Sequence, residues 1–195
     1  MKLVPVLPLA VFVSAAAFGL AQARTAGTRA AATPTQPVLA KVVYVDDGDT
    51  LVALLPDHQQ LKVRLANIDA PETGHGHCRP GQPHSDQSGR RLAELVKGRQ
   101  VELRCMDTDR YGRSVCDVVM GSTTANRILV QEGLAWANRG GNGYVRDRAV
   151  YELEDRARAA HVGLWQDRSP TPPWVWRHTE WLAPQPGCVR KGDRS

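Results

Sequence analysis

Five short segments of the chain are rich in hydrophobic residues, which in some of them alternate with polar ones, and each segment predicts a β-strand. The segments are residues 41–45, 50–55, 61–65, 101–105 and 115–120. The first two flank an Asp-Gly turn, which is a strong local signal for a hairpin. In the third, Leu and Val alternate with Lys62 and Arg64, so Arg64 is predicted on the polar face of its strand.

Three further segments carry hydrophobic residues at helical spacing. Residues 86–96, 124–132 and about 150–160 each end shortly before a glycine, as helices commonly do. Three strands, a helix, two strands and two helices indicate a small Greek-key barrel with helices packed against it. The best-known barrel with that count is the OB-fold. The predicted fold class is therefore α+β, rich in β-barrel: a five-stranded OB-fold Greek-key barrel with about three helices.

The N-terminus has the pattern of a secretory signal peptide, residues 1–23. Lys2 precedes an apolar stretch over residues 3–20, and Ala-Gln-Ala then forms an A-x-A cleavage site. The alternative is an uncleaved membrane anchor, because the stretch approaches the length of a spanning helix. Pro5, Pro8 and the cleavage site favour removal. We therefore expect a secreted or periplasmic protein with no stable membrane association after cleavage.

Composition divides the remaining chain into three parts. Residues 24–37 lack apolar periodicity and are predicted to be a flexible linker. A folded domain is expected over residues 38–166, with an irregular Pro/Trp-containing tail, residues 167–195, packed on it. The whole chain is 42% hydrophobic and 23% charged, with a net charge of +5, which suits one globular domain. This mild positive charge attracts polyanions but does not by itself identify a partner.

The chain has four cysteines, an even number, which in an exported protein indicates two disulfides. Cys105 and Cys116 lie in two predicted strands that flank a turn, so we expect a cross-strand bond between them. Cys78 and Cys188 would then pair by elimination and tie the tail to a long loop. Four cysteines allow three connectivities, and this pairing is one hypothesis among them.

Three clusters of charged residues lie at the ends of predicted strands. They are Asp47-Gly48-Asp49-Thr50, Arg64 to Glu72, and Asp109-Arg110-Tyr111-Gly112-Arg113. In the first, two carboxylates around a glycine direct oxygens to one point, as a hard cation such as Ca²⁺ requires. In the second, Pro71 stiffens the connection that carries Asp69 and Glu72. In the third, a turn presents Arg113, whose planar guanidinium can bind two phosphate oxygens. Each cluster alone is more typical of a plain solvent-exposed turn or loop than of a catalytic site.

Together the clusters supply the arginines, carboxylates and backbone carbonyl that metal-assisted phosphoryl transfer needs. In order and approximate spacing they resemble the three signature segments of the staphylococcal nuclease (thermonuclease) family. Residues 126–135 resemble the second helix of that family and residues 163–165 its end. The resemblance covers about residues 38–166.

The resemblance implies a Ca²⁺-dependent phosphodiesterase, a monomeric endonuclease that hydrolyses DNA and RNA by attack of water and leaves 3′-phosphate ends. The implied site residues are Arg64, Glu72 and Arg113 for catalysis, Asp49, Asp69 and the Ala70 carbonyl for Ca²⁺, Asp47 for a water-mediated contact to Ca²⁺, and Tyr111 for the substrate phosphate. The two arginines would hold the phosphate, and the glutamate would position or deprotonate the attacking water.

Two features depart from the pattern of that family. The loop of residues 74–84 is unusual, and a tyrosine expected after the second helix is missing, which suggests base stacking through Trp136 instead. An alternative use of the loop is a Zn²⁺ site with ligands His75, His77, Cys78 and His84. Irregular spacing and the expected disulfide favour a solvated histidine loop over zinc.

A second function fits the same fold: a noncatalytic OB-fold module that binds nucleic acid. Degenerate domains of this kind lose the arginines or the acids of the site. The chain keeps all five of these charged residues, Arg64, Arg113, Asp49, Asp69 and Glu72. Their retention favours the nuclease.

Overall fold

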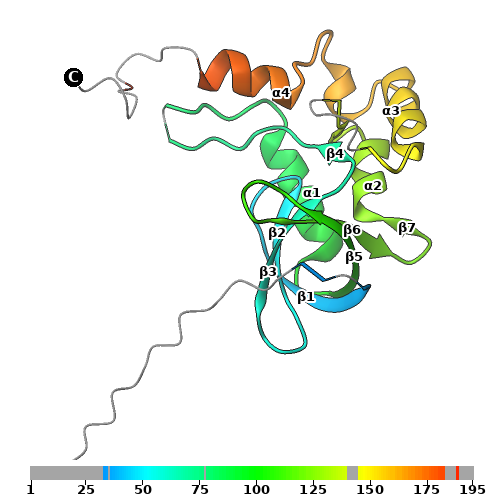
Figure 1. The fold of residues 1–195 in the computed structure, drawn as a ribbon. Coiled ribbons are helices and arrows are strands. Elements are labelled where there is room, and N and C mark those ends of the chain that lie inside the picture. The colour runs from blue at the N-terminus through cyan, green and yellow to red at the C-terminus, as the bar shows by residue number, and fades with distance from the viewer. Residues whose placement is uncertain (1–32, 35, 77, 140–144, 183–187, 189–195) are drawn as a thin grey trace, which may run out of the picture.

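A closed five-stranded β-barrel forms the centre of the molecule (Figure 1). The computed structural model describes residues 33–34, 36–76, 78–139, 145–182 and 188. The barrel strands are β1 (Val38–Val45), β2 (Thr50–Leu54), β3 (Gln60–Leu65), β5 (Gln100–Thr108) and β6 (Ser114–Met120). Neighbouring strands are antiparallel in the order β3-β2-β1-β5-β6, and a parallel pairing of β3 with β6 closes the barrel. The predicted OB-fold class is confirmed.

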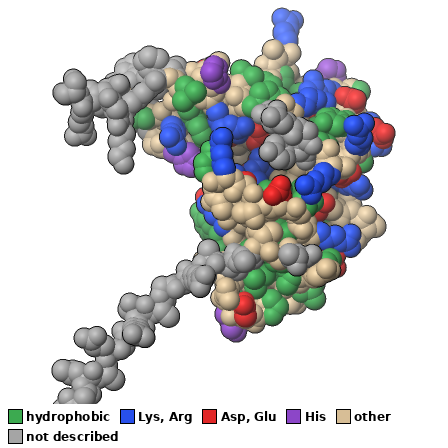
Figure 2. Space-filling model, viewed as in Figure 1, with side chains coloured by type: hydrophobic (Ala, Val, Ile, Leu, Met, Phe, Trp, Pro, Cys, Tyr) green, Lys and Arg blue, Asp and Glu red, His purple; other side chains and the backbone are tan. Residues whose placement is uncertain are grey.

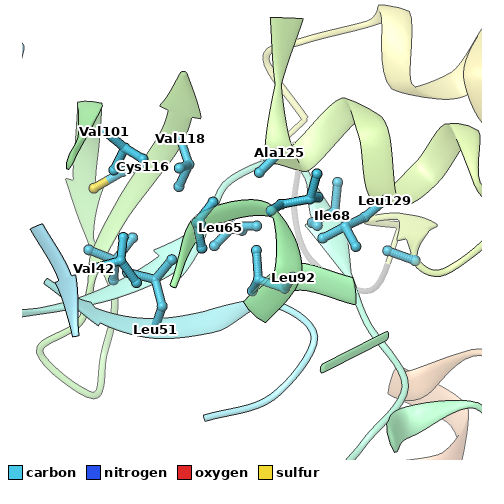
Figure 3. Close-up of a cluster of buried hydrophobic side chains, with 14 of the residues drawn as sticks. Val42, Leu51, Leu65, Ile68, Leu92, Val101, Cys116, Val118, Ala125 and Leu129 are labelled. Carbon is cyan, nitrogen blue, oxygen red and sulfur yellow. The ribbon is translucent and has the colours of Figure 1, made fainter. Parts of the chain in front are cut away.

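The core of the barrel follows from the alternation seen in the sequence. Leu61, Val63 and Leu65 on β3 are at most 1% exposed, whereas Arg64 between them points away from this core. Inward-facing side chains of the other strands, among them Val42 and Leu51, belong to the same core, and Figure 3 shows them with Leu65. Removal of this apolar surface from water is the main force that holds the barrel together.

Three helices lie close to the predicted positions; the first two pack on the barrel, and the third packs on the second. They are α1 (Ser85–Val96), α2 (Ala125–Gln131) and α3 (Ala149–Ala159). Leu92 of α1 and Leu129 of α2 enter the core. Asn126 of α2 is 1% exposed; it accepts a hydrogen bond from Val118 N at 3.0 Å and donates one to Ala66 O at 2.9 Å. This satisfied polar group ties α2 to β6 and to the chain that follows β3.

Two glycines let the end of α2 touch the start of the 3-10 helix η1 (Gly163–Gln166). Gly133 and Gly163 both have positive φ, and Leu164 N donates to Gly133 O at 2.7 Å. A Cβ atom on Gly163 would lie 2.2 Å from Gly133 O. The contact therefore requires glycine both for conformation and for space.

Several short elements were not predicted. A two-stranded sheet pairs β4 (Ile68–Asp69) with β8 (Trp136–Ala137), and β7 (Thr123–Thr124) pairs with β6. The tail was expected to be irregular, and this is wrong for α4 (Pro173–Trp176) and the π-helical η2 (Arg177–Trp181). Proline is accepted in the first turn of a helix because its missing N–H has no partner there. The tail helix lies beside the loop that leads from β4 to α1 (Figure 1).

Both expected disulfides are present. Cys105 and Cys116 face each other across β5 and β6, with Cα atoms 3.9 Å apart, and Cys78 is bonded to Cys188. The predicted signal peptide and most of the predicted linker lie outside the described residues. Within the described part, no helix is both long and apolar enough to cross a bilayer.

Candidate active site

The turn between β1 and β2 is packed so closely that only glycine fits at its centre. A Cβ atom on Gly48 would lie 2.0 Å from Ser88 Oγ on α1 and 2.7 Å from Ala70 Cβ. Inside the turn, Asp49 N donates to Asp47 Oδ1 at 2.9 Å. These contacts hold Asp49 between α1 and the chain that follows β4.

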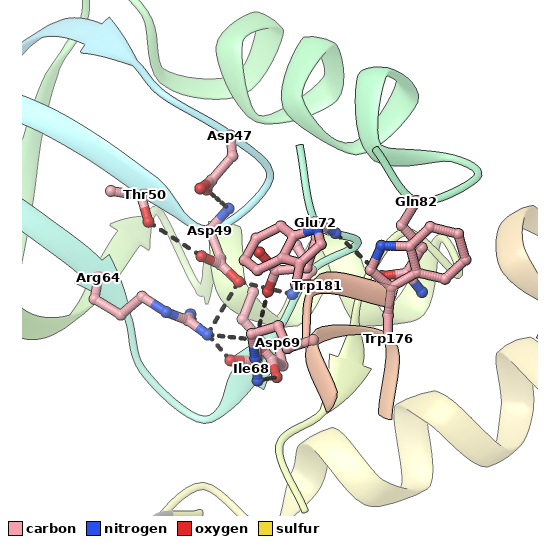
Figure 4. A network of polar contacts seen from close by, with 12 residues as sticks. Asp47, Asp49, Thr50, Arg64, Ile68, Asp69, Glu72, Gln82, Trp176 and Trp181 are labelled. Carbon is pink, nitrogen blue, oxygen red and sulfur yellow. Dashed lines mark hydrogen bonds and ion pairs between the residues drawn. The ribbon is translucent and has the colours of Figure 1, made fainter. Parts of the chain in front are cut away.

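Arg64 on β3 joins two buried carboxylates (Figure 4). Its Nη2 atom lies 3.0 Å from Asp49 Oδ2 and 2.8 Å from Asp69 Oδ1. Its Nη1 atom donates to Leu65 O at 2.9 Å and to Ile68 O at 3.1 Å. The donors of a guanidinium point in fixed directions. One side chain therefore sets the position of both acids and of the two backbone carbonyls that it binds.

The pairing of β4 with β8 positions the second carboxylate. Asp69 pairs with Trp136 through the backbone, and its side chain is 3% exposed. The next residue, Ala70, donates its N–H to Asp49 Oδ2 at 2.7 Å. The structure thus brings together Asp49, Asp69 and Ala70, the three residues predicted to bind Ca²⁺.

Arg113 is held at the tip of the β5–β6 hairpin by Asp109. Arg113 N donates to Asp109 Oδ1 at 2.9 Å and Arg113 Nε to Asp109 Oδ2 at 2.6 Å. Its Nη1 atom reaches Thr50 Oγ1 at 3.3 Å, and that hydroxyl donates to Asp49 Oδ1 at 3.2 Å. Thr50 therefore connects the two predicted phosphate-binding arginines through Asp49.

Tyr111 lies on the same hairpin tip and is 68% exposed. Its hydroxyl accepts a hydrogen bond from Arg110 Nη2 at 2.7 Å, and its ring lies under the guanidinium groups of Arg110 and Arg113. The phenol is open to solvent, at a position where a bound polyanion could meet it.

Glu72 is fixed from two sides. Its N–H donates to Gln82 Oε1 at 3.1 Å, and Gln82 N donates back to Glu72 O at 2.8 Å. Its carboxylate accepts a hydrogen bond from Arg177 Nη1, and Arg177 Nη2 also donates to Asp69 Oδ2 at 2.8 Å. A residue of the C-terminal tail thus enters the site.

Burial changes the acidity of two of these groups. It raises the pKa of Asp49 well above its usual range; the Arg64 charge opposes this rise, and the charges of Asp47 and Asp69 add to it. Burial also raises the pKa of Glu72, while Arg177 opposes that rise. The negative charge of the site is therefore costly to bury, which favours a cation beside it.

Oxygen donors from two carboxylates and a carbonyl suit a hard cation such as Ca²⁺. Nowhere in the described residues do three or more His, Cys, Asp or Glu side chains form a cluster that could hold a metal ion. The candidate set combines instead the carboxylates of Asp49 and Asp69 with the backbone oxygen of Ala70. Because the two buried acids already converge on Arg64, the residues fit a hard cation.

One sequence-based expectation is wrong, and one alternative that the sequence left open is excluded. Trp136 is 1% exposed and packs edge-on against Trp165, with ring centroids 5.7 Å apart, so it cannot stack on a base. The zinc alternative fails for Cys78, because its sulfur is bonded to Cys188 and is not a thiolate. His84 Nε2 lies 3.0 Å from Asp167 Oδ2, and His77 lies outside the described residues.

Sequence reasoning missed three contributors to the site: Thr50 as a link between arginines, Gln82, and Arg177. Gln82 and Arg177 lie in segments that have no regular pattern. One signal was available, because the expected pairing of Cys78 with Cys188 already tied the tail to the loop that follows Glu72. It pointed to the neighbourhood of the site but not to a residue.

Comparison with known proteins identifies the family of the chain. The model of the family described as "Staphylococcal nuclease homologue" matches residues 62–167. A protein of Shigella flexneri named "Micrococcal nuclease" is 38% identical over 146 residues, which cover 70% of this chain and 79% of the relative. An "Uncharacterized endonuclease" of Haemophilus influenzae is 35% identical over 140 residues, covering 72% and 73%. "Protein ParB" of Escherichia coli is 37% identical over 146 residues, covering 70% and 77%.

The barrel and its arginine–carboxylate site define a hydrolase built on an OB-fold. More closely, the chain belongs to the staphylococcal nuclease family. The expectations of that family and of a nuclease are confirmed.

Proposed function

We propose that the chain is a Ca²⁺-dependent phosphodiesterase that hydrolyses DNA and RNA and leaves 3′-phosphate ends. One observation carries the proposal: a continuous network runs from Arg113 through Thr50 and Asp49 to Arg64 and Asp69. It places two guanidinium groups and two buried acids at one end of the barrel, where a phosphate would find both positive charge and a cation site.

Arg64 and Arg113 bind the non-bridging oxygens of the scissile phosphate. They stabilise the charge that builds there in the transition state, and Tyr111 contacts the same phosphate. Glu72 orients the attacking water and takes its proton. Bond breaking on the 5′ side leaves the phosphate on the 3′ oxygen.

Asp49, Asp69 and the Ala70 carbonyl would hold the divalent cation, with Asp47 acting through water. When bound, Ca²⁺ would polarise the phosphoryl oxygen and help to neutralise its charge. The protein supplies the rigidity, because Arg64 fixes Asp49 and Asp69, and Ala70 is held by the hydrogen bond from its N–H to Asp49.

The contacts available to a substrate favour phosphate over base or sugar. Arginine and tyrosine side chains at the site address the backbone that DNA and RNA share, which carries no sequence information. Figure 2 shows further Lys and Arg side chains on the part of the molecule where helices cover the barrel. Broad substrate use follows from this chemistry.

We further infer that the chain works outside the cytoplasm, since two disulfides need an oxidising compartment. That it works as a monomer is what the family resemblance implies.

Digestion of plasmid DNA and of a folded RNA tests the function. Both should be cut in Ca²⁺, neither in chelator, and Mg²⁺ should support less cutting. Product ends should accept a 5′ label without prior dephosphorylation and should resist 3′ extension until a phosphatase is added. Binding of both polymers without cleavage would indicate the noncatalytic module instead.

A further inference from the structure

The C-terminal tail inserts a third arginine among the acids of the site. Arg177 donates to Asp69 Oδ1 at 3.3 Å and Oδ2 at 2.8 Å, and it also donates to Glu72 Oε1. Its side chain is 38% exposed, whereas those of Asp69 and Glu72 are 3% and 16% exposed. The guanidinium therefore covers two inward-facing carboxylates from the solvent side.

The tail is anchored on both sides of Arg177. Trp176 Nε1 and Trp181 Nε1 both donate to the same carbonyl, Pro80 O, at 3.1 and 3.0 Å. Figure 4 shows both indole rings beside Glu72 and Gln82. The Trp181 ring also meets His75 edge-on, with ring centroids 5.6 Å apart. The position of Arg177 thus follows from a built interface.

Further links join the same tail to the loop that precedes α1. Gln82 donates its side-chain amide to Thr171 O, while its Oε1 accepts from Glu72 N. The disulfide from Cys78 to Cys188 closes the interface beyond η2. One loop therefore positions both the candidate general base and the arginine that binds it.

Arg177 and a divalent cation would need the same oxygens. Asp69 Oδ1 already accepts from Arg64 and Arg177, and Asp69 Oδ2 accepts from Arg177. A carboxylate has about four acceptor positions, and a cation placed on Asp69 would also face the Arg177 charge at contact distance. Three of these positions are taken in the geometry seen here, and the two positive charges repel each other, so each weakens the binding of the other at Asp69.

We propose that Arg177 is an internal counter-ion that competes with the divalent cation for Asp69 and sets the affinity of the site for that cation. The inference rests on the proposed cation site. Without the cation, Arg177 compensates the charge of Asp69 and Glu72. Cation binding displaces it from Asp69 and releases Glu72 for the attacking water.

Direct measurement of Ca²⁺ binding tests the competition. Isothermal titration of Ca²⁺ into Arg177→Gln should give a dissociation constant about tenfold lower than that of the wild type, within the range usual for coupled binding. Arg168→Gln removes the same charge from an exposed position of the tail. This control should stay within about twofold, because exposed charges are screened by salt.

A stability measurement gives an independent readout. Without Ca²⁺, Arg177→Gln should unfold at a lower temperature than Arg168→Gln, and saturating Ca²⁺ should stabilise it more. In the wild type, the Nε–Hε NMR resonance of Arg177 should shift and exchange faster with water when Ca²⁺ is added, a test that needs no variant.

The outcomes separate this inference from the proposed function. Equal or weaker Ca²⁺ binding by folded Arg177→Gln, or an Arg177 resonance that does not respond to bound Ca²⁺, overturns the competition and leaves the cation site in place. No detectable Ca²⁺ binding by the wild type or by Arg177→Gln overturns both.

Discussion

At the scale of single residues, the two predicted phosphate-binding arginines differ in what they support. Arg64 is 13% exposed and pairs with both Asp49 and Asp69, so its removal would leave the buried Asp49 without its cation and Asp69 with Arg177 alone. Breaking such a pair typically costs about 3–5 kcal/mol. Arg113 is 24% exposed and pairs with Asp109 on a hairpin tip. Arg113 is therefore the cleaner probe of catalysis.

Arg113→Ala should lower the single-turnover rate about 10²–10³-fold, the loss typical of one donor that stabilises developing charge. Substrate affinity should change far less, because the contact strengthens in the transition state. Rapid-quench cleavage of a labelled oligonucleotide at saturating Ca²⁺ measures the rate. Arg104→Ala, on the exposed side of β5, is the matched control and should cut normally. A folded Arg113→Ala with a normal rate would exclude this role.

Protonation of Glu72 should lower the nuclease rate at acidic pH, which gives the pH–rate profile an acidic limb. Burial raises its pKa, with Arg177 opposing, so the carboxylate takes up its proton at a higher pH than an ordinary glutamate. The base form is needed, so the rate should fall as pH drops through this raised pKa. Glu72→Gln keeps the shape, should be slow at all pH values, and should lose that limb. Cleavage rates measured at saturating Ca²⁺ across pH 4.5 to 8 would show this fall in the wild type and its loss in the variant. An unchanged profile in the variant would assign the acidic limb to another group.

At the scale of elements, the connections matter as much as the strands. Asp69 is set by the two-residue pair of β4 with β8, and the positions of Glu72 and Arg177 depend on the loop and tail around Pro80. These short elements bring the ends of distant segments to the barrel. They add Asp69, Glu72 and Arg177 to a site whose other side chains come from the barrel strands and their hairpin turns.

The contact between α2 and η1 offers a test of this view. Gly163→Ala should destabilise the fold by about 3 kcal/mol or more, since a Cβ atom would strain a positive φ and meet Gly133 O. Gly98→Ala is the control: its φ is also positive, but nothing lies within 4 Å of the added atom. It should cost only about 1 kcal/mol. Urea unfolding followed by circular dichroism compares them, and equal losses would show that the steric contact is unimportant.

At the scale of the whole molecule, two disulfides join parts with different roles. Cys105–Cys116 links the two strands of the barrel hairpin that carries Arg113, and Cys78–Cys188 holds the tail against the loop beside the site. Both bonds need an oxidising compartment to form. The two disulfides therefore support the site as well as the stability of the fold, and they are compatible with a protein that works outside the cytoplasm.

Export should remove residues 1–23. Expression with a secretion-competent host should yield a mature chain that begins at Arg24, because cleavage follows the A-x-A site. N-terminal sequencing of the exported protein measures this. An intact Met1 on membrane-bound protein would favour the anchor.

The sequence by itself determined the barrel and most of the site. Alternation along residues 61–65 predicted which face of β3 is buried and where Arg64 points, because a strand has a period of two. The three charged clusters and the resemblance they carry named Asp49, Glu72 and Arg113, which the structure places in or beside one network.

Only the tertiary structure decided the rest, because it depends on contacts between segments far apart in the chain. No local pattern distinguishes a solvated tail arginine from Arg177, which lies 108 residues from Asp69 yet binds it. The same holds for Trp136: local sequence shows an aromatic residue after a helix, but the packing of Trp165 makes it part of the core. Periodicity reports which face is buried, whereas the partner across that face is set by how the whole chain folds.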